Sequence, residues 1–189
     1  MFDDIHAYFH ENVVAAYMQY KEARDNPRAG CSNDLRLAMS AATALYHFRE
    51  HLPPQHIRTR RQLASVCLDY DLLGDIVNAG KHRHVTHGTP QITSAEKIYE
   101  LVVITEYRDE KGRYLHNEKV VNVDLDNGTS RDLFEILTNV INMWLSELNS
   151  MGIMINPNFF PLPSNAIPSR SEAGTIPPLG RPMGTLFIC

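Results

Sequence analysis

Apolar residues recur every three or four positions along four segments of the chain, which is the spacing of helices with one buried face. Residues 3–24 form the first segment, and Asp25-Asn26-Pro27 ends it. Ser32 or Asn33 can cap the second, which runs to about Leu52, where Pro53-Pro54 stops it. The third and fourth segments run from about 69 to 81 and from 131 to about 148, the last capped by Thr129 or Ser130.

Between the third and fourth segments the apolar residues follow the alternating period of strands. YELVVITEY and KVVNVDL flank the turn residues Asp109 to Gly112, so residues 99–125 predict a β-hairpin with a loop of four to five residues. The predicted fold is therefore mainly α, a helical bundle of about four helices with an inserted β-hairpin, in a domain spanning residues 1–155.

The composition changes sharply after that domain, over residues 156–189. Seven of the eleven prolines lie in this segment, and its only charged residues are Arg170, Glu172 and Arg181. Proline prevents it from forming helices of its own, yet it retains several large apolar side chains. We expect an extended C-terminal arm that lies along its own domain or holds a homodimer or partner protein.

Composition and charge narrow the class of protein. The 189 residues suit a single domain, and 43% hydrophobic and 21% charged residues are ordinary values for a folded soluble protein. The net charge of −4 excludes a globally basic nucleic-acid coat. Three scattered cysteines do not form a disulfide framework, and neither a signal peptide nor a membrane span is visible, so we expect a cytoplasmic protein.

One helix carries a polar stripe with the residue types of a catalytic site. Asp71, Asp75, Asn78 and His82 are spaced by four, three and four residues, which places them within about 60° on one face of the third helix. A solvated helix face has this pattern, and so does a buried hydrogen-bond network. The third alternative is a site, because an imidazole titrates near neutral pH and acts as acid or base beside a carboxylate.

The run Asp75-Ile-Val-Asn78-Ala-Gly-Lys81-His82, in a compact helical chain, resembles the HEPN superfamily of helical-bundle proteins. The resemblance covers roughly residues 3–85 and 130–150, and it implies a dimeric toxin or antiviral defence effector that cleaves RNA without metal or cofactor. Asn78 and His82 are the catalytic candidates that carry over from the resemblance, and Asp75 of the same stripe is the third candidate. The family's arginine, separated from the histidine by four to six residues, is missing before His82, so the resemblance also fits an inactive relative.

Two histidines of the second helix match a zinc motif. His47-Phe-Arg-Glu50-His51 spells H-x-x-E-H, the pattern of inverted zincins. That family takes a third ligand, a glutamate, about 75 residues onward, where this chain has Asp126-Asn127-Gly128. We therefore expect His47 and His51 to be surface residues, and no metal or cofactor site is predicted.

The sequence leads to two functional hypotheses of different class. The first is a HEPN-like protein of a bacterial or phage-conflict system, either an RNA-cleaving effector or its inactive relative. The alternative is a non-enzymatic interaction subunit that assembles a larger complex through its C-terminal arm and apolar helix faces.

Overall fold

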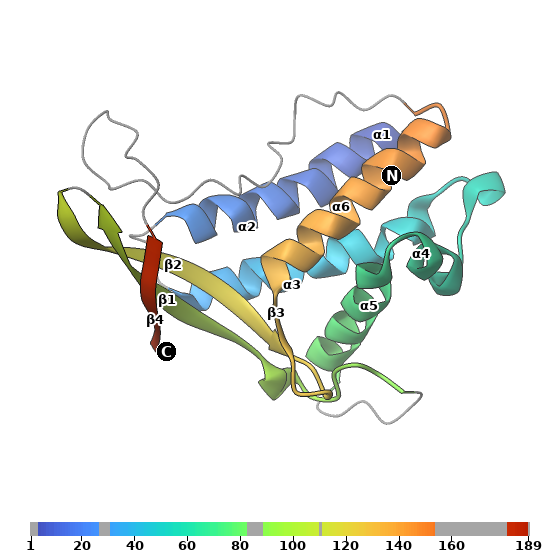
Figure 1. Ribbon diagram of the computed structural model, residues 1–189. Helices are drawn as coiled ribbons and strands as arrows, with labels where there is room; N and C mark the ends of the chain where they lie inside the picture. The colour runs from blue at the N-terminus through green and yellow to red at the C-terminus, as the bar shows by residue number, and fades with distance from the viewer. Residues whose placement is uncertain (1–3, 27–30, 83–88, 110, 154–180, 189) are drawn as a thin grey trace.

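The computed structural model describes residues 4–26, 31–82, 89–109, 111–153 and 181–188, and it is mainly α-helical (Figure 1). All four long helical segments predicted from the apolar spacing are present. The first is continuous but contains a π-helical stretch, and the others are regular α-helices. Their bounds are α1 Ile5–Tyr8, η1 Phe9–Val14 and α2 Ala15–Asp25 for the first, then α3 Cys31–His47, α5 Leu68–Lys81 and α6 Leu133–Ser150.

Helix boundaries differ from the prediction where local geometry intervenes. The α-helical part of α3 ends at His47, five residues before Leu52, and its last turn tightens into the 3-10 segment η2, Phe48–His51. The predicted caps of α3, Ser32 and Asn33, lie inside the helix, because α3 already begins at Cys31. Helix α6 begins at Leu133, because Asp132 rather than Thr129 or Ser130 caps it by accepting a hydrogen bond from the Phe134 N–H (2.9 Å).

A fifth helix, α4 Arg60–Val66, follows the short 3-10 turn η3 Pro54–His56. The sequence analysis did not predict it. Thr59 caps it through a capping box, in which its hydroxyl accepts from the Gln62 N–H while the Gln62 side chain accepts from the Thr59 N–H. The Thr-x-x-Gln spacing is a helix-start signal in the sequence, so this helix was detectable.

The predicted hairpin is confirmed, and two further strands extend it into a sheet of order β3-β2-β1-β4. After the short turn η4 Ala95–Lys97, β1 Ile98–Asp109 pairs with β2 Gly112–Asp124, leaving a loop of only two residues. Gly112 has φ +112°, a conformation that L side chains rarely adopt. Strand β3, Ser130–Asp132, pairs with the end of β2.

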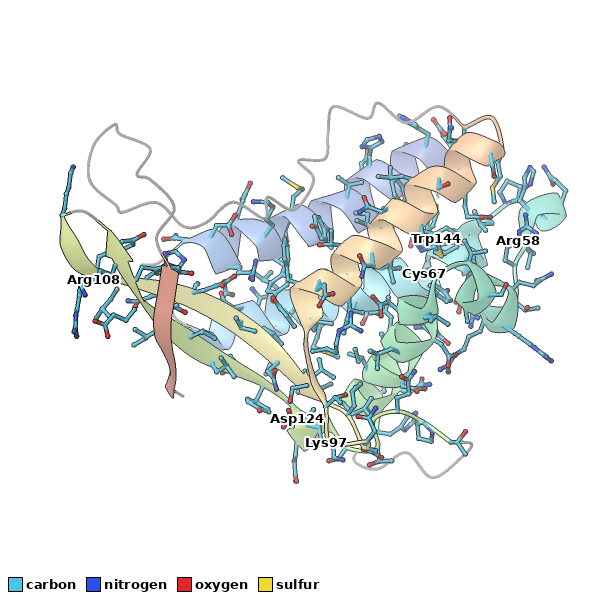
Figure 2. The ribbon with its side chains drawn as sticks, in the orientation of Figure 1. Arg58, Cys67, Lys97, Arg108, Asp124 and Trp144 are labelled. Atoms are coloured by element: carbon cyan, nitrogen blue, oxygen red, sulfur yellow. The ribbon has the colours of Figure 1, made fainter. Side chains whose placement is uncertain are left out.

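Strand β4, Arg181–Ile188, comes from the C-terminal arm and pairs antiparallel with β1. The arm therefore returns to its own domain at this strand, while residues 154–180 of it lie outside the described part. Helices α2, α3 and α6 contact the inner part of the hairpin, and its far end, where Arg108 lies, projects beyond the helices (Figures 1 and 2).

The core lies among the helices and against the inner part of the sheet, and Trp144 of α6 lies in its helical part (Figure 2). This indole is fully buried, donates its Nε1–H to the Leu45 carbonyl (2.9 Å), and packs edge-on against Phe48 and Tyr70. Among the described residues, no helix is both long and apolar enough to cross a membrane.

Candidate functional site

The polar stripe of α5 is present, but its members lie in different environments. Asp75 is buried, Asn78 is half-buried and His82 is exposed. His82 is the C-cap residue of α5 and has an extended backbone, with its N–H bonded to the Asn78 carbonyl (3.0 Å). His82 thus lies just beyond the helix, at the exposed end of the stripe.

Arg60, from the unpredicted helix α4, holds the first half of the stripe. Its Nε lies 2.6 Å from Asp71 Oδ1, and its Nη2 lies 2.6 Å from Asp75 Oδ1. Nη2 also donates to the Asp71 carbonyl (2.8 Å). Partial burial lowers the pKa of Arg60, but the hydrogen bonds to the two carboxylates outweigh burial and raise it above its ordinary value. Arg60 is therefore a permanent cation on this face of α5.

A glycine allows this close approach between α4, α5 and α3. A Cβ at Gly74 would lie 2.7 Å from Tyr46 Cε2 and 2.9 Å from Arg60 Cζ. Any other side chain there would displace the guanidinium that binds Asp75. Close packing therefore explains the glycine at position 74, although a glycine inside a helix destabilises the helix itself.

Asp75 joins α5 to the chain that leads into the sheet. Its second oxygen, Oδ2, accepts the backbone N–H of Gln91 (2.8 Å). The Gln91 carbonyl in turn accepts from the Asp126 N–H (2.9 Å). Asp75 thus links Gln91 directly to α5. This role is structural, since both of its oxygens are already engaged.

A second polar cluster joins the H-x-x-E-H motif to the end of the stripe. The Nζ atom of Lys81 lies 2.9 Å from His47 Nε2, and His47 Nδ1 lies 2.8 Å from Glu50 Oε1. The hydrogen bond from His47 lowers the pKa of the Glu50 carboxyl, although slight burial opposes this. Lys81 and Glu50 are exposed and His47 is partly buried, so this row of three hydrogen-bonded side chains is open to solvent.

His51, the other histidine of that motif, has a different partner. Its Nε2 lies 2.8 Å from the Tyr8 hydroxyl, and the two rings stack with centroids 3.9 Å apart. Partial burial, with the nearby Glu50 charge, raises the pKa of Tyr8. Because His47 and His51 direct Nε2 to Lys81 and Tyr8, they are not arranged around a common metal position. No cluster of three or more metal-ligating side chains occurs in the described ranges.

The structure therefore separates the three predicted site residues and adds others. Asp75 belongs to the Arg60 cluster, whereas Asn78 lies three residues from both Asp75 and Lys81, one turn from each cluster. The sequence analysis did not single out Arg60, and it did not connect His47 with Lys81. No local signal could have found that contact, because 34 positions separate the two residues.

The chain was compared with known protein families, with curated proteins and with solved structures, and none of the three comparisons found a match.

Proposed function

We propose that the protein is a HEPN-like effector of a bacterial or phage-conflict system that cleaves RNA without metal. The supporting observation is the exposed end of α5, where Lys81 and His82 follow one another and His47 approaches from α3. Metal-independent cleavage of a phosphodiester needs a group that accepts a proton and a cation that stabilises the charge developing on phosphate. This end of α5 offers both types of group.

Within this proposal the three predicted residues have different roles. His82 and Asn78 are the site candidates, because His82 is exposed and Asn78 lies one turn before it. Asp75 is a positioning residue that holds Gln91 against α5. Dimerisation, which the HEPN resemblance implies, is part of the same proposal, and light scattering of the full chain tests it.

Induced expression of the full chain tests the function directly. An RNA-cleaving effector impairs growth, and the purified protein cleaves total RNA in the presence of EDTA. His82→Ala and Asn78→Ala should each abolish cleavage and toxicity while the melting temperature stays unchanged. A harmless protein with no cleavage of RNA would contradict the proposal.

The alternative function, an interaction subunit, has one specific observation in its favour. Ile57, Val66 and Leu68, within or next to α4, are large apolar residues that are mostly exposed. Exposed apolar side chains concentrated along one short stretch of chain are typical of contact surfaces. Under this alternative, expression is harmless, a partner copurifies, and replacing Leu68 with Ser removes the partner.

A further inference from the structure

The histidine of α3 is better organised for acid–base chemistry than the histidine that the family resemblance selects. His47 is bonded on both ring nitrogens, to Glu50 on one side and to Lys81 on the other. We propose that His47 is the general base of the RNA cleavage, that Lys81 binds the scissile phosphate, and that Glu50 positions the His47 ring. This inference rests on the proposed function and specifies the site within it.

The partners of His47 determine which of its nitrogens carries the proton. A lysine ammonium has only donors, so Nε2 accepts from Lys81 and must be unprotonated. Nδ1 then carries the hydrogen and donates it to the Glu50 carboxylate. The neutral imidazole therefore presents its basic nitrogen on the side of the ring where the Lys81 ammonium lies. A base needs this tautomer, and a carboxylate that fixes it is a known way of orienting a catalytic histidine.

The proposed step balances with RNA and water alone. The Lys81 ammonium moves from Nε2 to a non-bridging phosphate oxygen, which frees the basic nitrogen. Nε2 takes the proton of the 2′-hydroxyl, the 2′-oxygen forms a bond to phosphorus, and the bond from phosphorus to the 5′-oxygen breaks. The leaving 5′-oxygen takes a proton from water, and His47 later returns its proton to solvent. The products are a 2′,3′-cyclic phosphate and a 5′-hydroxyl.

The surroundings of His47 suit an extended, anionic ligand. Glu50 and Lys81 are exposed, the ring of Tyr46 lies against His47 with centroids 5.1 Å apart, and Arg49 lies over that ring at 4.9 Å. Lys81 thus provides a cation in direct contact with the imidazole, and Arg49 provides a second one over the ring of Tyr46, which contacts the imidazole. His51 is less suitable as the base, because its ring is bonded to the Tyr8 hydroxyl and no carboxylate of the described residues is bonded to it, whereas Glu50 is bonded to the ring of His47.

The test uses the full chain and a mixed-sequence single-stranded RNA oligonucleotide carrying a fluorophore and a quencher, in buffer with EDTA. We expect His47→Ala and Lys81→Met each to lower kcat/KM by about 100-fold or more, as loss of a general base or of a charge-stabilising group does. A 2′-O-methyl version of the oligonucleotide should resist cleavage, and mass spectrometry should find a 2′,3′-cyclic phosphate on the product. His56→Ala, outside the cluster, is the matched histidine control and should keep full activity.

Variants of Glu50 separate positioning from a merely structural role. Glu50→Ala should lower kcat by up to about 100-fold with KM unchanged, because a misplaced base reacts slowly. Glu50→Gln should recover most of that loss, since its amide oxygen still accepts the Nδ1–H bond. Equal activity of the two variants would show that Glu50 does not position His47.

The outcomes distinguish this inference from the function on which it rests. If the wild type cleaves RNA and His47→Ala stays within threefold of it, the assignment of the base is overturned while the proposed function stands. If the wild type neither cleaves RNA nor impairs growth, both are overturned. Equal melting temperatures of wild type and variants establish that any loss arises in the site.

Discussion

Lys119 and Asp34, 85 positions apart in the chain, form an ion pair that is almost completely buried between β2 and α3. The closest nitrogen–oxygen distance is 2.9 Å, and the same ammonium also donates to the Ala23 carbonyl near the end of α2. Arg24 extends this contact by donating to the Lys119 carbonyl (3.2 Å) and to Asp132, the cap of α6 (3.0 Å). One polar network therefore joins α2, α3, β2 and α6.

Removing one member of this pair should be strongly destabilising. We expect Lys119→Ala to lower the free energy of unfolding by about 3–5 kcal/mol, because the Asp34 charge stays buried without its cation. Replacing both residues together, by Met at 119 and Leu at 34, should recover much of the loss. Lys97→Ala, which breaks the partly exposed pair with Asp126, is the control and should be far less destabilising than Lys119→Ala, because solvent screens an exposed ion pair. Urea denaturation measures all three variants, and similar losses for Lys119→Ala and Lys97→Ala would contradict the prediction.

Two residues of the same stripe should respond differently to replacement. Asp75→Ala removes the acceptor of the Gln91 N–H, in a partly buried hydrogen bond, and one of the two carboxylates that bind Arg60, so we expect a loss of about 2–4 kcal/mol. His82→Ala should change stability by no more than about 0.5 kcal/mol, because His82 is exposed at the helix end. Chemical denaturation of both variants tests this. A loss below about 1 kcal/mol for Asp75→Ala would contradict the structural role given to the contacts of Asp75 with Arg60 and Gln91.

Buried tyrosines should make stability fall at alkaline pH. Burial raises the pKa of Tyr20 well above its ordinary value, so the folded protein holds the hydroxyl proton more tightly than the unfolded chain does. The contribution of Tyr20 is therefore complete below about pH 10, the unfolded pKa, and declines above it by about 1.4 kcal/mol per pH unit. Tyr20→Phe should remove this part of the slope between pH 10 and 11.

The same variant has an expected effect at neutral pH. The Tyr20 hydroxyl is fully buried and makes no hydrogen bond of normal geometry to any described residue. Removing it should therefore leave stability at pH 7 unchanged or slightly higher. Equilibrium unfolding at pH 7 and over pH 9–11, compared between wild type and variant, measures both effects. An unchanged alkaline slope would contradict the role given to Tyr20.

Truncating the C-terminal arm should change self-association. Deleting residues 156–189 removes β4 and leaves the edge of β1 from Val102 to Arg108 without this partner. Open strand edges pair with other chains, so we expect a larger mass in light scattering while circular dichroism keeps its helical signal. A smaller mass would instead support an arm that holds the homodimer together. If the truncated protein loses its helical signal, the expectation that the helical domain folds without the arm is wrong.

The apolar spacing determined most of the secondary structure. The amphipathic patterns of α2, α5 and α6 and the alternation in β1 and β2 record local geometry, since each period reflects which side chains share one face of an element. The capping box at Thr59 is equally local, and its spacing was available in the sequence. Composition predicted a C-terminal arm, but it did not predict that Arg181–Ile188 pairs with β1, because strand pairing depends on residues far apart in the chain.

The grouping of side chains around α5 was decided by the tertiary structure. Helices α3 and α5 pack closely and run antiparallel, since Gly74 lies against Tyr46 and Gly80 against Met39. That crossing brings His47 to Lys81, and the placement of α4 brings Arg60 to Asp75. In the sequence, two glycines in a helix only indicate a weaker helix, and a polar stripe looks uniform along its length. Burial of one end and exposure of the other follow from which helices pack against it, and helical periodicity carries no information about that packing.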